Sequence, residues 1–118
     1  MGDPMRNAAL LLLVLTGAWA EAAQAAGRSG NQTNDRLLSL PAAEQAQTLA
    51  NNVGNGCVGT EAFLMGVTTT GKAKGYAYWS VRCKDGRSFA VQIAPDAKFL
   101  VVDCQVLKEN GKECFKKF

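Results

Sequence analysis

Four cysteines are the residues of this chain that could do chemistry, as disulfides, as a redox pair or as metal ligands. They are Cys57, Cys83, Cys104 and Cys114. All four follow a segment with the pattern of an export signal, and exported chains reach oxidising compartments where cysteines form disulfides. The chain contains no Cys-x-x-Cys motif and no histidine, so a zinc site would need all four cysteines from distant segments. The pattern favours structural disulfides.

The missing histidine also excludes common catalytic arrangements. Neither a Ser-His-Asp triad nor a Cys-His pair can form. The carboxylate pairs Asp96/Asp103 and Glu109/Glu113 could act in acid–base catalysis, but nothing in the sequence places either pair in a cleft. We therefore expect no enzyme activity, no cofactor and no metal. The alternative left open is a small envelope enzyme or thiol-redox protein that uses the cysteines.

One segment imitates a nucleotide-binding loop. Residues 66–73 (GVTTTGKA) match the phosphate-binding pattern up to its last position, where Ala73 replaces the hydroxyl that binds magnesium. Such a loop should also open a helix, whereas residues 76–83 alternate like a strand. The segment is therefore predicted to be a glycine-flanked hairpin loop.

An export signal is predicted over residues 1–25. A short basic region precedes the apolar run 8–15, and small residues offer cleavage after Ala20 or, preferably, after Ala25. A retained membrane anchor would need about 20 apolar residues, and Glu21 interrupts any such run. We expect a periplasmic or secreted protein with no stable membrane anchor after cleavage.

The distribution of charge in the sequence indicates which class of partner to expect. The net charge is +3, and the basic residues are spaced singly, with only Lys116 and Lys117 adjacent, rather than gathered on a helix or dense patch. Nucleic-acid binding is therefore not expected, and the partner is predicted to be an envelope or secreted protein. Asn31-Gln32-Thr33 is a formal glycosylation sequon, which we interpret as a chance occurrence.

Residues 26–36 are polar and contain glycine, so a flexible lead-in is predicted there, followed by a single small domain over 37–118. The one expected helix covers 38–53, because apolar residues recur there at helical spacing and glycines follow. Pro41 suits the start of that helix. Its apolar stripe is thin and rich in alanine, which predicts close packing against a sheet.

The sequence specifies one hairpin of the sheet well. Residues 76–83 and 88–93 both alternate between apolar and polar, with Lys84-Asp85-Gly86-Arg87 between them. A two-residue Asp-Gly turn would place apolar and polar side chains together on each face of the hairpin. A three-residue turn with Gly86 in the left-handed region instead pairs Val81 with Phe89 and keeps the apolar residues together.

Alternating apolar and polar residues also predict the neighbouring strands. Residues 95–98 form the next turn into a strand over 99–107, with Ile93 opposite Leu100 and Val91 opposite Val102. A first strand contains Phe63, Met65 and Val67. The predicted fold class is α+β, with one N-terminal helix packed on a four-stranded antiparallel meander stapled by disulfides. The inner face would hold the following residues: Trp79, Val81, Phe89, Val91, Ile93, Leu100 and Val102.

This register predicts the disulfide pairing. Four cysteines allow three pairings. Cys83 and Cys104 would lie on non-neighbouring strands roughly 10 Å apart, whereas a disulfide needs Cα atoms about 4.4–6.8 Å apart. Cys57–Cys83 and Cys104–Cys114 are the pairs within reach, each worth about 3 kcal/mol by constraint of the unfolded chain.

The outer face of the sheet is the predicted binding face. It would present the following side chains: Leu64, Tyr76, Tyr78, Arg82, Gln92, Phe99, Val101 and Asp103. Exposed tyrosine with arginine is typical of binding surfaces. The competing interpretation is that the C-terminal tail folds back and that Phe115 and Phe118 cover this face.

Several short runs together suggest a relationship. They are Cys57-x-Gly59, residues 62–66 (AFLMG), 78–83 (YWSVRC), 86–89 (GRSF), 93–96 (IAPD) and Cys114-Phe115. In these runs the chain resembles small exported proteins of alphaproteobacteria, a family without a known activity. The resemblance implies a periplasmic or secreted bacterial domain and supplies no catalytic residues.

In fold alone, a helix with a meander is similar to PepSY-type domains and bacterial lysozyme inhibitors, and the Cys83-Lys-Asp-Gly86 turn is like one in the c-type lysozyme inhibitors. No convincing counterpart of their inhibitory loop is present, and a shared fold does not imply a shared function. The expected function is a non-catalytic binding or inhibitory module of the periplasm.

Overall fold

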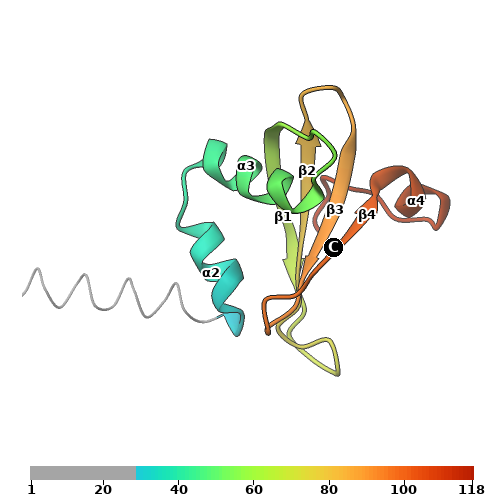
Figure 1. Cartoon of the computed structure of the whole chain (residues 1–118). Coiled ribbons are helices and arrows are strands. Elements are labelled where there is room, and N and C mark those ends of the chain that lie inside the picture. The colour runs from blue at the N-terminus through green and yellow to red at the C-terminus, as the bar shows by residue number, and fades with distance from the viewer. Residues whose placement is uncertain (1–28) are drawn as a thin grey trace, which may run out of the picture.

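The computed structural model describes residues 29–118 (Figure 1). The predicted export signal and the first residues of the predicted lead-in lie outside these residues. Two helices come first, α2 (Gln32–Leu38) and α3 (Ala42–Val53). The sheet follows, with β1 (Gly59–Val67), β2 (Ala77–Cys83), β3 (Ser88–Ile93) and β4 (Phe99–Asp103). A short helix, α4 (Cys104–Glu109), then leads into residues 110–118, called the tail below.

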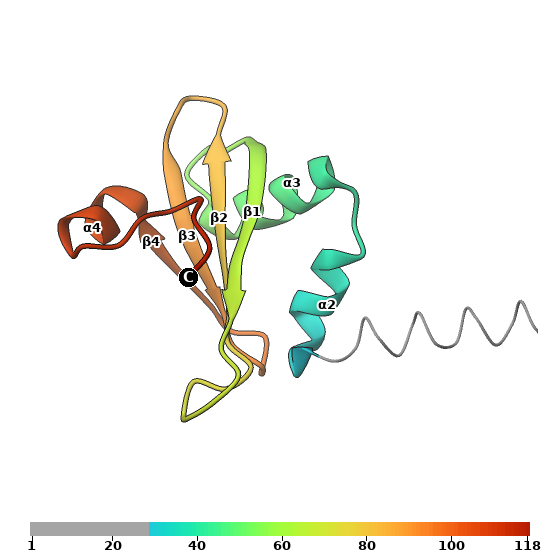
Figure 2. The ribbon, with the colours of Figure 1, turned by 180° about the vertical axis from the view of Figure 1, so that it is seen from behind.

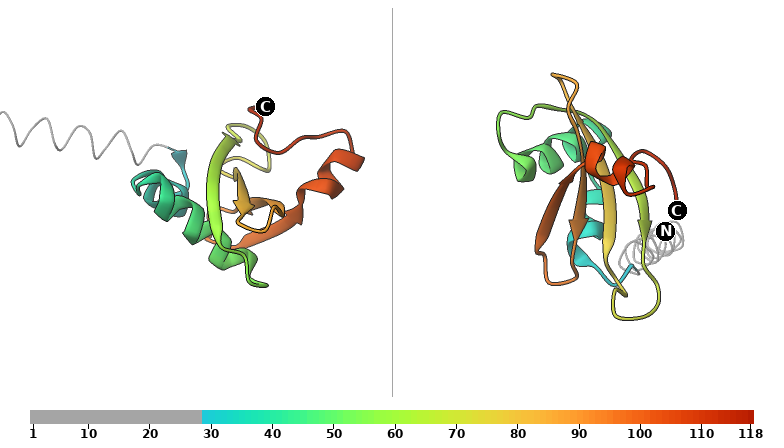
Figure 3. Two further views of the ribbon diagram at one scale, coloured as in Figure 1. Left: turned by 90° about the horizontal axis from the view of Figure 1, so that it is seen from above. Right: turned by 90° about the vertical axis from the view of Figure 1, so that its right-hand side faces the viewer.

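The strands form an antiparallel meander in the order β1-β2-β3-β4. Helices α2 and α3 lie on one face of this sheet, and α4 and the tail lie on the other (Figures 2 and 3). The first is called the helix face and the second the tail face. The predicted α+β class, with a helix on a four-stranded meander and two disulfides, is confirmed. No helix of the described residues is long and apolar enough to cross a membrane.

The β2–β3 hairpin has the predicted register. Val81 lies opposite Phe89, and Trp79 lies opposite Val91. The N–H of Cys83 donates to the carbonyl of Arg87 at 2.8 Å, which closes a three-residue turn. Gly86 has φ +94°, in the left-handed region that glycine adopts without steric cost.

The predicted β3–β4 register is wrong by one residue. Ile93 lies opposite Phe99 and not Leu100, and Val91 lies opposite Val101 and not Val102. The cause is the turn, which has three residues like the first hairpin, with Ala97 at φ +72° in the position that Gly86 occupies there. A one-residue slip moves every side chain of a strand to the opposite face.

This one-residue difference in register places four apolar side chains on the face opposite to the predicted one. Phe99 and Val101, predicted to be on the outer face, pack against the core on the helix face. Leu100 and Val102, predicted to be in the core, lie on the tail face.

Strand β1 also differs from its predicted pattern. Leu64 was predicted on the outer face but lies opposite Trp79 and packs against the core. An irregularity in the β1–β2 pairing between Leu64 and Gly66 shifts the alternation, so Met65 faces the tail. A bulge of this kind inserts one residue and cannot be seen in a simple alternating pattern.

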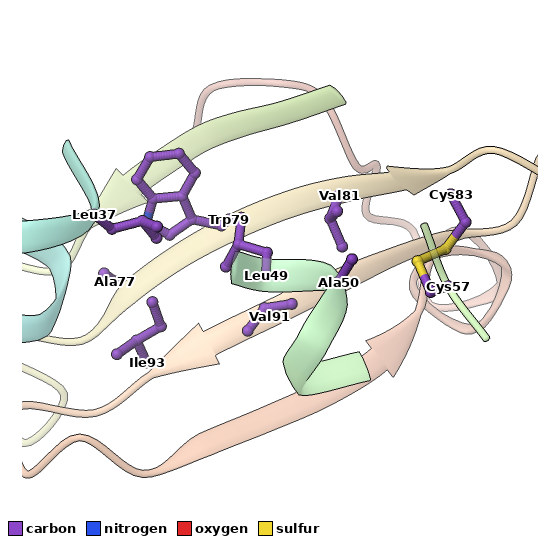
Figure 4. Close-up of a cluster of buried hydrophobic side chains, with 10 residues drawn as sticks. All are labelled: Leu37, Leu49, Ala50, Cys57, Ala77, Trp79, Val81, Cys83, Val91 and Ile93. Atoms are coloured by element: carbon purple, nitrogen blue, oxygen red, sulfur yellow. A yellow bond between two sulfur atoms is a disulfide. The ribbon is translucent and has the colours of Figure 1, made fainter. Parts of the chain in front are cut away.

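The core lies between α3 and the helix face of the sheet (Figure 4). Trp79 and Val81 of β2 and Val91 and Ile93 of β3 are buried beneath Leu49. The predicted close approach of the alanine-rich helix is confirmed, because a Cβ on Gly59 of β1 would overlap the backbone carbonyl of Ala46 in α3.

Helix α2 was not predicted, and it occupies residues 32–36 of the expected flexible lead-in. Asn31 begins it, since its side-chain oxygen accepts from the N–H of Asn34 at 2.9 Å, as an N-cap does. The Asn31 amide also donates to the carbonyls of Gly75 and Ile93, each at 2.9 Å. The helix expected over 38–53 is α3, which begins at Ala42, and Ser39–Pro41 separate it from the additional helix α2.

Both predicted disulfides are present, Cys57–Cys83 and Cys104–Cys114. The first lies at the end of the core and is buried. The last predicted strand ends early, because Asp103 caps α4 by accepting from the N–H of Gln105 at 2.8 Å. Residues 104–107 are thus helical and not extended.

Candidate functional site

A groove lies between the tail face of the sheet and the tail, with a volume of about 810 Å³. In Figure 3 (left), α4 and the tail stand away from the sheet on the side opposite α2 and α3. The sheet supplies the floor of the groove: Met65, Tyr78, Ala90, Gln92, Leu100 and Val102. Residues 68 and 73 of the β1–β2 loop lie at its margin. The C-terminal segment supplies the wall: Leu107, Gly111, Lys112, Glu113, Lys116, Lys117 and Phe118.

The apolar floor is a direct result of the β3–β4 register. Leu100 and Val102 point toward the tail because their neighbours Phe99 and Val101 fill the core. Leu100 is 54% exposed, and it lies opposite Gln92 of the neighbouring strand. A solvent-facing leucine on its own is ordinary, but Leu100 and Val102 lie on the same face of β4 and Val102 is opposite Ala90 of β3, so these side chains form an apolar patch.

The Cys104–Cys114 disulfide and two backbone contacts hold the tail over the sheet. The N–H of Phe115 donates to the hydroxyl of Ser80 at 2.9 Å, and the N–H of Phe118 donates to the carbonyl of Met65 at 3.4 Å. Ser80 is fully buried, so this contact fixes the tail to the middle of β2.

Aromatic and cationic side chains complete the attachment of the tail. The Arg82 guanidinium lies 4.4 Å from the centre of the Phe115 ring and pairs with Glu61 at 2.6 Å. Phe115 also lies near Phe63, at 6.3 Å between ring centres. A guanidinium over an aromatic face is attractive because the face carries partial negative charge.

Phe118 covers its end of the groove only partly. Its ring meets Tyr78 edge to face, with 5.5 Å between the ring centres, and a Cβ on Gly66 would overlap it. Phe118 is nevertheless 76% exposed. The tail therefore folds back over this face of the sheet, as the competing interpretation predicts. It does not pack against the whole face, and the groove beneath it stays open.

The wall of the groove carries more positive than negative charge. Its charged residues are Lys112, Glu113, Lys116 and Lys117. The ion pairs found within residues 29–118 join Arg82 to Glu61, Arg87 to Asp85 and Lys98 to Asp96, and none involves the wall. Lys117 is directed at the Phe63 ring, with its nitrogen 5.9 Å from the ring centre.

The predicted binding face is partly assembled. Tyr78 and Gln92 lie opposite each other and line the groove. Arg82 holds the tail beside the groove and does not line it, and Tyr76 precedes β2 outside the lining. Leu64, Phe99 and Val101 belong to the core side, which corrects their predicted placement. Asp103 caps α4.

Sequence reasoning missed the residues that define the groove, chiefly Leu100, Val102, Leu107 and the tail lysines. The first two follow from the three-residue turn at Pro95–Ala97. A turn like that at Lys84–Gly86 was the available signal, but Ala97 stands where the glycine would be. The lysines could not be assigned to a groove because their position depends on the path of the tail.

The described residues offer little for catalysis or metal binding. None of the cysteines is free, and no group of three or more histidine, cysteine or acidic residues could hold a metal ion within residues 29–118. Glu113 lines the groove without Glu109. The segment that imitates a nucleotide-binding loop is a hairpin loop between β1 and β2, as predicted, and opens no helix.

Comparison of the chain with protein-family models, curated proteins and solved structures gives no match.

Proposed function

We propose that this domain is a non-catalytic binding module of the periplasm or the extracellular medium, and that its ligand occupies the groove between the tail face and the tail. The groove is the supporting observation, because it is a concave, largely apolar space that the chain builds and does not fill. Ligand sites commonly have volumes of about 300–1,000 Å³, with apolar lining and few polar groups. The volume of about 810 Å³ lies in that range.

The way the groove is built supports binding rather than chemistry. Its floor consists of strand side chains held rigidly by the sheet, and its polar floor residues, Tyr78 and Gln92, can orient a ligand by hydrogen bonds. The tail wall is covalently tied by Cys104–Cys114. Such a wall is stable where thiols are oxidised, which agrees with the proposed location.

The alternative, a thiol-redox protein, has less support. Both disulfides are formed, and their cysteines lie 26 and 10 positions apart in the sequence, not in the Cys-x-x-Cys spacing that catalytic dithiols favour. Neither pair lines the groove.

A neutral dye that fluoresces in apolar surroundings, Nile red, tests the proposal. The wild-type domain should bind it, and Leu100→Arg should abolish binding because a cation enters the apolar floor. Val58→Arg is the matched control, since Val58 is 52% exposed, close to the 54% of Leu100, and lies outside the groove. Both variants should keep the wild-type thermal midpoint. Equal dye binding by the two variants, or no binding by the wild type, would reject the groove as the site.

A further inference from the structure

We infer that the ligand of the groove is an amphiphile with one apolar chain and an anionic head group, of which a long-chain carboxylate is the simplest example. This assignment rests on the proposed function and adds the chemical class of the ligand. Two observations carry it: the apolar floor and the lysines of the wall.

The floor suits an alkyl chain. Leu100 and Val102 of β4 present hydrocarbon to the groove, the nearly buried Ala90 of β3 and Met65 of β1 complete the apolar floor, and Leu107 of α4 lines the wall. Binding of a flexible alkyl chain is favourable because it removes apolar surface of both the chain and the floor from water. Such a chain needs no hydrogen bonds along its length.

The same floor does not suit a peptide strand. An extended peptide carries N–H and C=O groups that must find partners when they leave water. Such peptides usually add to a free sheet edge, but β2 and β3, in the middle of the floor, are paired on both sides. The middle of the floor, on β2 and β3, therefore offers contact to side chains and no backbone partners.

The wall suits an anionic head group. Lys112, Lys116 and Lys117 outnumber Glu113, the one acidic side chain of the wall, and none of the three lysines forms an ion pair with the residues from 29 to 118. Hydrogen bonds between ammonium and carboxylate groups are stronger than neutral ones. An anion at the wall would thus satisfy charges that the chain leaves without a partner there, whereas a cation would be repelled.

Competition for the groove tests this class directly. Dodecanoate, dodecanol and dodecyltrimethylammonium share one chain and differ in head-group charge, and each is titrated below its micelle concentration against the Nile red complex. Dodecanoate should displace the dye at a concentration about tenfold lower than dodecanol, as one charge-assisted contact predicts. Dodecyltrimethylammonium should be the weakest. Octanoate should bind more weakly than dodecanoate, by up to about fourfold for each methylene removed.

Paired lysine variants locate the head group. Lys112→Gln with Lys116→Gln should lower dodecanoate affinity about tenfold and leave dodecanol affinity unchanged. Lys84→Gln with Lys98→Gln removes the same amount of charge outside the groove and should change neither affinity. This control separates local contact from the overall charge of the domain.

The outcomes separate the two proposals. If dodecanoate and dodecanol bind equally and the lysine pair has no effect, the anionic head group is wrong. If octanoate binds as tightly as dodecanoate, or if no amphiphile displaces a dye that Leu100→Arg excludes, the alkyl chain is wrong while the binding site stands. Failure of the wild-type domain to bind Nile red overturns the proposed function itself.

Discussion

The indole N–H of Trp79 donates a 2.7 Å hydrogen bond to the side-chain oxygen of Asn34. Trp79 lies in the centre of β2 and Asn34 in α2, so the bond joins the middle of the sheet to the first helix. Both side chains are buried, and a buried indole N–H without a partner loses the free energy of its solvation. The bond therefore fixes the position of α2.

Asn34→Ala should lower the free energy of unfolding by about 1–3 kcal/mol, because the buried N–H of Trp79 then lacks its acceptor. Asn52→Ala on the exposed face of α3 is the control and should change stability by less than about 0.5 kcal/mol. Urea unfolding measures both. The double variant Asn34→Ala with Trp79→Phe should lose less than the sum of the single losses, and strict additivity would contradict the coupling.

The two disulfides should open in order on reduction. Cys57 and Cys83 are buried, whereas Cys104 and Cys114 are half-buried, so a dithiol reaches the second bridge first. The native protein should show no free thiol, and mild reduction should label only Cys104 and Cys114 in peptide maps. Cys57→Ser should release Cys83 as a free thiol and leave the other bridge intact. A peptide joining Cys83 to Cys104 would contradict the pairing.

Removal of Phe115–Phe118 should lower the free energy of unfolding by about 1 kcal/mol or more, because Phe115 and Phe118 pack on the sheet. Thermal unfolding measures this effect. Gly66→Ala is a gentler change. Its Cβ would overlap the Phe118 ring, so it should displace that ring with little effect on the rest of the domain. Unchanged stability after truncation would show that the tail contributes no packing.

Ala97→Gly should stabilise the domain, and Gly86→Ala should destabilise it, each by about 1 kcal/mol. The two residues hold equivalent places in three-residue turns, with φ +72° and +94°, where alanine is strained and glycine is not. The opposite signs make each variant the control of the other. Equal effects of both in chemical denaturation would contradict the turn geometry.

Asp85→Asn should reduce stability at neutral pH and have no effect in acid. The pKa of Asp85 is lowered first by the hydrogen bond from the Arg87 N–H, and also by the Arg87 guanidinium, whose nitrogen lies 2.8 Å away. A lowered carboxyl pKa stabilises the fold above the ordinary value, about 3.9, and this contribution is lost as the pH falls through the lowered value. Because Asp85 is exposed, the difference should be small. Unfolding curves between neutral pH and about pH 2 would reveal it.

The parts of the fold that could be predicted are those where one residue type determines the geometry. Gly86 determined the first hairpin, and that register in turn determined the cysteine pairing. Ala97 adopts the same left-handed backbone conformation, but an alanine gives no sequence signal of it. The residues of the last strand were therefore predicted on the opposite faces of the sheet. The floor of the groove could not be found once Leu100 had been assigned to the core.

Helix α2 could not be predicted for a different reason. Its stability depends on Asn31 and Asn34, which look like loop residues in the sequence. Their hydrogen-bond partners, Gly75, Trp79 and Ile93, lie 44 to 62 residues away. Only the assembled sheet supplies these acceptors and donors, so the helix is a consequence of tertiary structure.

The burial of Asn31 has a practical consequence for producing this protein. Its side chain is 1% exposed, and both amide hydrogens are used by the carbonyls of Gly75 and Ile93. A glycan on the Asn31-Gln32-Thr33 sequon would replace one of these hydrogens and cannot fit inside the folded domain. A eukaryotic secretory host, which attaches glycans before folding is complete, would therefore trap a share of the chains in a form unable to dock α2. A bacterial host, or Thr33→Ala in a eukaryotic one, avoids that loss of yield.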